Sequence, residues 1–307
     1  MSKAPRRQAT VAGITAIAAI TAVAVFLTTN SPAATTTSRA SAARVIDDRL
    51  ESVTGWAPAI GSGGLRGDLA ARYADFDLVV VDGQEAKPSQ IAAIQSNGSL
   101  VLGYLSVGTI ESYRPWYDAA KRYRLESWKD WQGEWFARVS APGFRHLISR
   151  QIAPGMLDKG FDGLFLDNTD MIYDHRGQTA GMRRLIATLG EMRERRGTLL
   201  FAQNGAETIG PSLRYLDGWN REDVSWTYDF NHHEYRRQGD GARRAAQDEL
   251  TEIAARGLLV SAIDYTAPGD DAADAESIAN ACAVGALPFA SNISLRRIPA
   301  SAYRCEG

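Results

Sequence analysis

Cysteine and histidine are scarce in this sequence, which excludes the commonest zinc sites of proteins. The 307 residues contain two cysteines and four histidines, without a Cys-x-x-Cys motif. A structural zinc site takes four such ligands. The adjacent His232 and His233 lack the i, i+4 spacing that places two ligands on one face of a helix, and such pairs are more typical of surface loops. We therefore expect neither a metal nor another cofactor.

Long basic runs and nucleotide-binding glycine motifs are missing as well. The formal net charge is −2, and the basic clusters are short, as at 193–196. Nucleic-acid-binding proteins usually carry a basic patch, so we expect no nucleic-acid partner. No Gly-x-Gly-x-x-Gly turn follows an early strand, which removes the main support for a doubly wound open sheet. With 45% apolar and 23% charged residues, the composition is typical of a globular protein.

The N-terminal residues resemble an export signal. Three basic residues at positions 3–7 precede an apolar run over 11–27, and small residues follow it. This order is typical of a signal peptide, and the run is also close to the minimum length of a membrane span. We expect residues 1–34 to be a cleaved signal or a retained anchor, residues 35–50 a flexible linker, and residues 51–307 the folded domain. Both outcomes place that domain outside the cell or in its envelope, touching a membrane only through an uncleaved N-terminal segment.

The two cysteines, Cys282 and Cys305, both lie near the C-terminus. In an oxidising compartment, one disulfide between them would fix the tail to the domain. The alternative is two free thiols, with Cys282 buried in an apolar helix expected at 278–284. The sequence leaves both alternatives open.

Beyond residue 50, short apolar runs alternate with segments whose apolar residues recur at helical spacing. The runs predict eight strands at 55–61, 76–82, 100–106, 163–167, 198–204, 216–222, 257–264 and 286–291. The segments between them predict helices, among them 88–95, 142–159, 179–196, 242–256 and 272–284. Near-continuous apolar runs are typical of parallel strands covered on both faces. Eight strands alternating with helices over about 250 residues predict an α/β fold, a single (β/α)8 TIM barrel.

Glycine and proline positions add detail to this prediction. Gly160, Gly197 and Gly257 each follow an expected helix just before the next strand, where a left-handed helix C-cap is favoured. Pro58 lies inside the first expected strand and cannot donate a backbone hydrogen bond. That strand is therefore expected at an edge of the sheet or with an irregular course.

Polar residues end almost every predicted strand. The set comprises Asp82, Tyr104, Ser106, Asp167, Asn168, Asp170, Gln203, Asn204, Glu222, Asp223, Asp264, Tyr265, Ser291 and Asn292. The C-terminal ends of barrel strands meet at one rim, where catalytic groups lie. Paired carboxyl groups supply the proton transfer and nucleophilic attack that hydrolysis of a sugar polymer needs, and amides and hydroxyls suit the ring hydroxyls. Acids outnumber the nearby Arg114 and Arg221, so we expect a negative rim that favours a cationic substrate.

The carboxylates at the end of the fourth strand have two alternative readings. Asp167 could cap a following helix, and Asp170 could support the first turn of that helix. Their oxygens also suit calcium or magnesium, although the Asp-x-Asp-x-Asp-Gly pattern of a calcium loop is absent. The residues alone do not decide among these readings.

A long segment between the third and fourth strands is rich in aromatic residues. It contains four of the seven tryptophans, Trp116, Trp128, Trp131 and Trp135. These side chains could fix a long loop to the barrel. They could also stack against the apolar faces of sugar rings in a cleft wall.

Five spaced segments, in a fixed order, carry a resemblance to a known family. They are 104–114 (YLSVGTIESYR), 160–170 (GFDGLFLDNTD), 203–205 (QNG), 220–223 (NRED) and 260–265 (VSAIDY). Together they resemble glycoside hydrolase family 114, the endo-α-1,4-polygalactosaminidase family. The resemblance implies a (β/α)8 barrel in which Asp167 is the nucleophile and Glu222 the acid/base residue of a retaining mechanism.

The resemblance also implies a substrate, an α-1,4-linked polysaccharide that contains the cationic sugar galactosamine. The residues expected to bind it are Asp82, Tyr104, Glu111, Asp170, Asn204, Asp264 and Tyr265. We expect the protein to act as a monomer. One alternative is a barrel of the cell envelope that binds polysaccharide without cleaving it, and another is metal-dependent hydrolysis or deacetylation.

Overall fold

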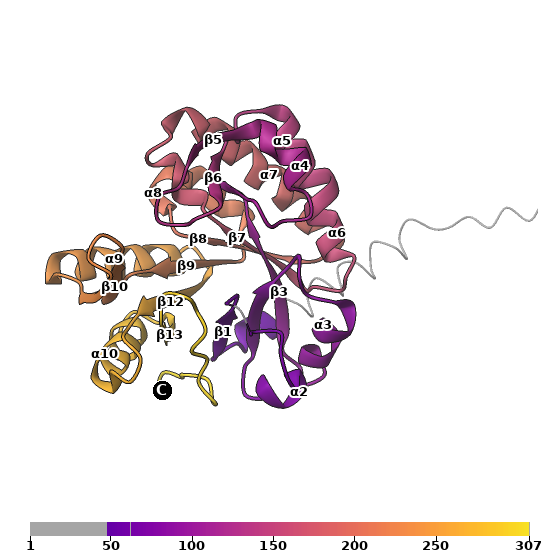
Figure 1. The fold of residues 1–307 in the computed structure, drawn as a ribbon. Coiled ribbons are helices and arrows are strands. Elements are labelled where there is room, and N and C mark those ends of the chain that lie inside the picture. The colour runs from indigo at the N-terminus through magenta and orange to yellow at the C-terminus, as the bar shows by residue number, and fades with distance from the viewer. Residues whose placement is uncertain (1–47, 62, 307) are drawn as a thin grey trace, which may run out of the picture.

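The computed structural model describes residues 48–61 and 63–306, and its centre is an eight-stranded parallel sheet with the order β1-β2-β3-β7-β8-β9-β12-β13. The strands are β1 (Trp56–Ala59), β2 (Leu78–Asp82), β3 (Leu100–Ser106), β7 (Gly163–Asp167), β8 (Leu199–Gln203), β9 (Gly218–Glu222), β12 (Leu259–Tyr265) and β13 (Leu287–Ser291). Figure 1 shows these strands at the centre, with helices around them. The prediction of a (β/α)8 TIM barrel is confirmed, and the segment 1–34 lies outside the described residues.

Helices cover the outside of the sheet. They are α2 (Leu69–Arg72), α3 (Pro88–Gln95), α4 (Tyr117–Ala120), α5 (Pro142–Leu147), α6 (Ala153–Leu157), α7 (Thr179–Arg196), α8 (Ala206–Ile209), α9 (Asp240–Ala254) and α10 (Asp271–Cys282). The predicted helix at 142–159 is divided into α5 and α6 by a π-helical turn, η2 (Ile148–Ile152). Pro154 has no backbone N–H for a regular helical bond, and the wider turn before it accommodates the ring.

Strands β1 and β13 are the first and last strands of the sheet order, and they lie next to each other. Pro58 of β1 is paired with Val80 of β2. Strand β1 has no ladder partner on its other side among the described residues, so the sheet loses no hydrogen bond through the missing N–H of the proline. The indole Nε1 of Trp56 donates to the carbonyl oxygen of Leu287 at 3.1 Å and so joins β1 to β13. The prediction of an edge strand around Pro58 is confirmed.

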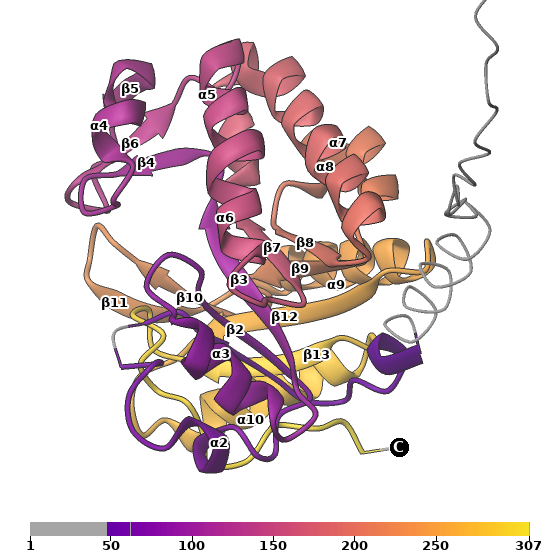
Figure 2. The same ribbon diagram turned by 90° about the vertical axis from the view of Figure 1, so that its right-hand side faces the viewer.

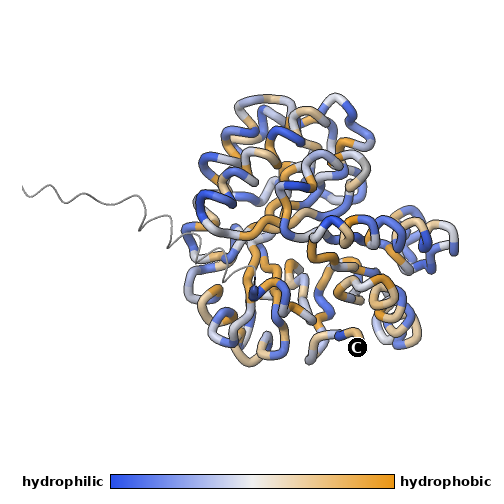
Figure 3. Tube along the Cα trace, turned by 180° about the vertical axis from the view of Figure 1, so that it is seen from behind, coloured by the Kyte–Doolittle hydropathy of each residue, from blue (hydrophilic) through white to orange (hydrophobic). Residues whose placement is uncertain are grey.

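The barrel interior is filled by apolar side chains. Trp56 of β1 packs against Phe165 of β7, with ring centroids 6.4 Å apart, and against Phe289 of β13, at 6.1 Å. Because β2 and β3 lie between β1 and β7 in the sheet, the contact between Trp56 and Phe165 crosses the interior. Figure 3 shows hydrophobic segments in the centre and hydrophilic ones at the periphery. Close packing of this kind fixes the positions of the strand ends.

Two antiparallel excursions leave the barrel, and the sequence patterns did not predict either of them. The first is a three-stranded sheet of β4 (Thr109–Glu111), β6 (Glu134–Ala137) and β5 (Arg124–Ser127). The second is a hairpin of β10 (Trp226–Asp229) and β11 (Glu234–Arg237). Figure 2 shows both excursions on the same side of the barrel. They extend the rim that carries the polar strand ends.

The three glycines expected to end helices adopt left-handed backbone angles. Gly160, Gly197 and Gly257 have φ values of 105°, 64° and 84°. Gly197 is the C-cap residue of α7, and its N–H donates to the carbonyl oxygen of Arg193. These angles are favourable for glycine and strained for residues with a Cβ, so the prediction of left-handed helix ends is confirmed.

A disulfide joins Cys282, at the end of α10, to Cys305 in the C-terminal tail. The structure thereby shows the pairing that the sequence left open. Next to it, Arg304 donates to the Asp77 carboxylate at 2.9 Å, and the same carboxylate accepts from the N–H of Gly55. The tail is therefore attached both to α10 and to the start of the barrel.

Replacing Cys282 and Cys305 together with serine should lower the free energy of unfolding. The bond closes a loop with a sequence separation of 23. A loop of about this length restricts the unfolded chain enough to contribute about 3 kcal/mol. Urea denaturation of the parent and the double variant measures the difference, with reduced parent protein as the control. Equal midpoints for the oxidised parent and the double variant would contradict a stabilising role.

No helix among the described residues combines the length and the apolar character that crossing a bilayer requires. The apolar run at 11–27, expected to be a signal or an anchor, lies outside the residues that the structure describes.

Candidate active site

Strand β7 is an apolar strand that ends in Asp167. Four hydrogen-bond donors converge on this carboxylate. Tyr104 Oη donates to Oδ2 at 2.6 Å, and Gln203 Nε2 donates to Oδ1 at 2.8 Å. Asn168 contributes its backbone N–H, at 2.7 Å, and its side-chain Nδ2, at 3.3 Å. Donors of this kind stabilise the ionised form of a carboxyl group.

Glu222 ends strand β9 and lies in the same part of the rim. Asn204 Nδ2 donates to its Oε2 at 2.7 Å, and the hydroxyl of Tyr265 donates to its Oε1. The Oδ1 atom of Asn204 accepts from the Glu222 N–H at 3.0 Å, which fixes the orientation of that amide. Tyr265 is the last residue of β12, the strand that pairs with β9. Two neighbouring strands thus hold the glutamate from both sides.

The electrostatics of the two carboxyl groups differ. The pKa of Glu222 is raised to about 8, first by burial and then by the charges of Asp167 and Asp223. Burial also raises the pKa of Asp167, and hydrogen bonds from Tyr104 and Asn168 oppose this effect. Four donors hold Asp167, whereas two hold Glu222 in the described part of the chain. The hydrogen bonds therefore favour the anion on Asp167, and the raised pKa favours the proton on Glu222.

Three residues that follow these strands adopt left-handed backbone angles. Asn168, Asn204 and Asp223 come directly after β7, β8 and β9, with φ values of 57°, 54° and 59°. Asparagine and aspartate tolerate this region better than other residues with a Cβ. The chain thereby turns sharply after each strand, so that the last strand residue and the one after it both face the rim. Clustered strain of this kind is typical of functional sites.

The rim encloses a cavity of about 560 Å³. Eight of the nine residues predicted for the site line it, namely Asp82, Tyr104, Glu111, Asp167, Asp170, Asn204, Glu222 and Tyr265. Its lining contains seven carboxyl groups and two arginines, Arg114 and Arg296. The structure therefore gathers side chains from the ends of distant strands in one acidic cavity.

Asp264 is the predicted site residue that the structure places elsewhere. It is buried outside the cavity lining, and its carboxylate accepts from the backbone N–H of Ser225 at 2.9 Å. Burial raises its pKa to about 6. Its contacts indicate that it holds the segment between β9 and β10 in place, and its position does not suit direct sugar binding. Strand alternation explains the difference, since its neighbour Tyr265 points to Glu222.

Asp82 and Glu111 share one buried cation. The Arg114 guanidinium donates from Nη1 to Asp82 at 2.6 Å, and it donates from Nε and Nη2 to Glu111. The Asp82 carboxylate also accepts from the backbone N–H groups of Gln84 and Glu85. This network joins the end of β2 to the first excursion. Both carboxylates are therefore paired with Arg114.

The tryptophan-rich segment contributes both to packing and to the lining of the cavity. Trp128 and Trp131 line the cavity. Trp135 packs outside it against Tyr117, at 5.9 Å, and so supports the excursion. Trp131 also contacts Phe230 of the second excursion, with ring centroids 5.6 Å apart. The two excursions therefore meet through aromatic rings beside the cavity.

Sequence reasoning missed Glu134, Phe230 and residues 293–296 in the loop after β13, all of which line the cavity. Glu134 and Phe230 belong to excursions rather than to barrel strands, so the rule of polar strand ends did not reach them. The sequence carries no distinct signal for Glu134, because Asp130 precedes Trp131 just as Glu134 precedes Trp135.

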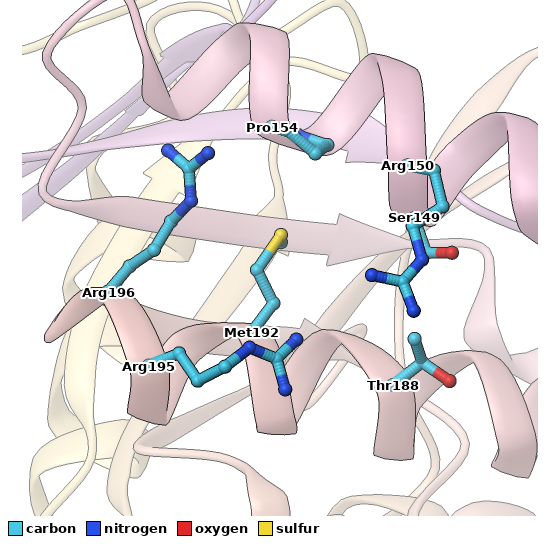
Figure 4. Close-up of a pocket in the computed structure, with 7 residues that line it drawn as sticks. All are labelled: Ser149, Arg150, Pro154, Thr188, Met192, Arg195 and Arg196. Carbon is cyan, nitrogen blue, oxygen red and sulfur yellow. The ribbon is translucent and has the colours of Figure 1, made fainter. Parts of the chain in front are cut away.

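Two other features of the described residues are not part of this cavity: a group of possible metal ligands and a smaller cavity. Asp229, His232 and Glu234 have potential metal-ligating atoms within 4.8 Å of one another, and the two last residues are exposed. His232 Nδ1 lies 2.9 Å from Asp229 Oδ2, at the surface position expected for it. A smaller cavity of about 260 Å³ lies between η2, α6 and α7, lined by Arg150, Arg195 and Arg196 among others (Figure 4). None of its seven lining residues carries a carboxyl group, so this smaller cavity offers no pair of carboxyl groups for acid-base catalysis.

The comparison with known families decides the classification. The sequence model of glycoside-hydrolase family GH114 matches residues 35–299, most of the chain. This chain belongs to family GH114. The GH114 resemblance seen in the spaced motifs is thereby confirmed. Membership in this family supports glycoside hydrolase activity.

Solved structures share the fold of this GH114 chain. The glycoside hydrolase domain of PelA from Pseudomonas aeruginosa aligns with a TM-score of 0.68 and 23% identity, over 80% of this chain and 97% of that one. Ega3 from Aspergillus fumigatus, in complex with galactosamine, aligns with a TM-score of 0.61 and 18% identity, over 79% of this chain and 92% of that one.

Two curated relatives are uncharacterised proteins. One, from Deinococcus radiodurans, is 24% identical over 147 residues, which are 45% of this chain and 47% of the relative. The other, from Methanocaldococcus jannaschii, is 21% identical over 229 residues, which are 64% of this chain and 62% of the relative. The GH114 chain thus spans about half of the first relative and less than two thirds of the second.

The Tyr265→Phe variant of this GH114 chain should show a higher pKa for Glu222. The tyrosine hydroxyl stabilises the ionised glutamate and thereby lowers its pKa, so its removal favours the protonated form. We expect the alkaline limb of the activity profile to move to higher pH, while the acid limb stays in place. Hydrolysis rates between pH 5 and pH 10 measure both limbs. An alkaline limb that stays at the parental pH would show that the ionisation of Glu222 does not set this limb.

Proposed function

We infer that this GH114 chain hydrolyses an α-1,4-linked polysaccharide that contains galactosamine. The observation that carries the proposal is the carboxyl pair at the ends of β7 and β9, in which hydrogen-bond donors converge on Asp167 and burial raises the pKa of Glu222. Glycosidases need two carboxyl groups in these two states. The galactosamine bound to Ega3, which shares this fold, supports the choice of sugar.

The proposed mechanism assigns one role to each member of the pair. Asp167 attacks the anomeric carbon while Glu222 transfers its proton to the glycosidic oxygen, so that the bond to the leaving sugar breaks. The product of this step is a glycosyl ester on Asp167. The ionised Glu222 then removes a proton from water, the oxygen of that water attacks the anomeric carbon, and Asp167 is released. Tyr104 and Gln203 position the nucleophile through their hydrogen bonds.

The proposed substrate is a cationic polymer because the cavity is acidic beyond the catalytic pair. Asp170 and Asp223 line it, and burial raises the pKa of each to about 6. Both remain mostly ionised at neutral pH and attract amino groups. Trp128 and Trp131 provide apolar faces against which sugar rings can stack.

We also propose that the chain is exported and acts as a monomer, in or outside the cell envelope. The N-terminal apolar run with its basic flank supports export. The formation of a disulfide agrees with an oxidising compartment. In one described chain, the cavity already combines both carboxyl groups with the tyrosines and amides that hold them.

Product analysis tests the proposed substrate. The purified protein is incubated with α-1,4-linked galactosamine polymer and, separately, with a neutral galactose polymer, and mass spectrometry follows the soluble products. We expect oligosaccharides of galactosamine from the first polymer and a much slower reaction with the second. Tight retention of the cationic polymer without new oligosaccharides would instead support a binding barrel and contradict hydrolysis.

A further inference from the structure

Glu134 is a cavity carboxyl group that the proposed mechanism does not use. It lies at the start of β6, in the first excursion, and lines the cavity. Thr109 Oγ1 donates to its Oε2 at 3.1 Å. The ion pairs among the described residues include Arg114 with Asp82 and Arg114 with Glu111, but none includes Glu134. A half-buried carboxylate without a cation is costly, and such groups are candidates for a functional role.

The strand register places Glu134 opposite another acid. In the antiparallel pair of β4 and β6, Glu111 and Glu134 are direct partners. Side chains of directly opposed residues lie on the same face, where like charges destabilise the pair. The buried Arg114 compensates Glu111 and Asp82, so this wall of the cavity holds three carboxyl groups and one guanidinium. When all three are ionised, the carboxyl groups of this wall exceed its positive charge by two.

The groups around Glu134 mostly disfavour its negative charge. Burial raises the pKa of Glu134 to about 7, and the charges of Glu111 and Asp167 add to the effect, while the Thr109 hydrogen bond and Arg114 oppose it. The phenols of Tyr104 and Tyr113 also lie within range of its charge. The cavity's second arginine, Arg296, is exposed in the loop after β13. A ligand cation would add positive charge to that of Arg114, which is already ion-paired with Asp82 and Glu111.

Hydrogen bonds connect Glu134 to the proposed nucleophile. Asn168 Nδ2 contacts Asp167 Oδ2 and Thr109 Oγ1, each at 3.3 Å, and Thr109 in turn donates to Glu134. A bound sugar must place its anomeric carbon against Asp167. In a 2-amino sugar, the amino group is attached to the neighbouring ring carbon and so lies beside Asp167, whose charge also acts on Glu134.

We propose that Glu134 is a specificity-determining residue that binds the ammonium group of an amino sugar beside Asp167. The inference rests on the proposed function, because it concerns the sugar that occupies the same cavity. It explains why the acidic pair of Glu111 and Glu134 is built into a cavity wall whose guanidinium, that of Arg114, already binds Asp82 and Glu111. An N-acetylated sugar has no charge at this position and gains nothing from the carboxylate.

The Glu134→Gln variant tests the proposal kinetically. Glutamine keeps the size of the side chain and can still accept from Thr109, but it removes the charge. We expect kcat/KM for the deacetylated galactosamine polymer to fall about tenfold or more, as for loss of a charged hydrogen bond, with less than about a twofold change for the N-acetylated polymer. The control is Glu126→Gln on β5, which removes an exposed carboxylate of the same excursion outside the cavity. Equal losses on both polymers, or no loss on the deacetylated one, would overturn the proposal.

A binding experiment separates this proposal from the proposed hydrolysis. NMR titrations measure the Kd of galactosamine and of galactose for the parent protein and for Glu134→Gln. We expect the parent to prefer galactosamine and the variant to lose that preference, whether or not the parent cleaves either polymer. A parent that binds the two sugars equally, or a variant that keeps the preference, would exclude Glu134 as the ammonium site. Absence of hydrolysis by a parent with the expected preference would reject the hydrolase and retain the recognition site.

Discussion

The Asp167→Asn variant should lose turnover of the galactosamine polymer by at least about 10³-fold, because an amide cannot form the glycosyl ester. Its fold should persist. Asparagine has the same shape as aspartate, and its oxygen can still accept from Tyr104 or Gln203. Removal of a buried charge near Glu222 should also lower the pKa of that glutamate. Oligosaccharide release over time measures the loss, and thermal unfolding monitors the fold.

Asp118→Asn is the matched control for this substitution. Asp118 lies on α4 with 87% of its side chain exposed and pairs only with Lys121 among the described residues. Activity of this variant should equal that of the parent. Full activity of a folded Asp167→Asn protein would reject Asp167 as the nucleophile and would leave its four hydrogen bonds without a catalytic explanation.

The Glu222→Gln variant should show a loss that depends on the leaving group. Glutamine cannot protonate the glycosidic oxygen, so cleavage between two sugars should fall by about 10²–10⁴-fold. An aryl glycoside of galactosamine releases a phenolate that needs little protonation, and we expect its first cleavage step to be much less affected. Pre-steady-state release of the phenol measures that step. Equal losses for the polymer and the aryl glycoside would argue against proton donation by Glu222.

The pH dependence of the parent follows from the same two groups. Glu222 acts as an acid only while protonated, and its pKa is raised to about 8. The activity should therefore be present below about pH 8 and fall as the pH rises through this value. Asp167 acts only as an anion, so activity should fall again at acidic pH. In Glu222→Gln, the alkaline limb should disappear and the acid limb should remain.

The barrel was predictable because each of its strands carries a strong local signal. Parallel strands covered on both faces appear as short apolar runs, and β2 and β7 are of this kind. Glycines such as Gly197 mark the helix ends between them. The site followed from topology, since a barrel collects the C-terminal ends of its strands at one rim. For this reason Asp167 and Glu222 are brought together although 54 other residues separate them in the sequence.

The parts that could not be predicted depend on contacts beyond the barrel strands. The antiparallel sheet that presents Glu134 is short, and its register is fixed by pairing with β4 rather than by an apolar pattern of its own. Asp264 has the sequence features of a rim residue, yet its side chain turns to the N–H of Ser225. Which side of a strand end faces the cavity is decided by packing, and a single sequence carries little information about it.

The measurement that tests the account most directly is the release of reducing ends from partially deacetylated galactosaminogalactan. Purified parent protein and Glu222→Gln are assayed side by side, with circular dichroism to verify that both are folded. The account predicts steady release by the parent and a trace by the variant. Release at the parental rate by Glu222→Gln, or none by the folded parent, would contradict a two-carboxylate hydrolase for this polymer.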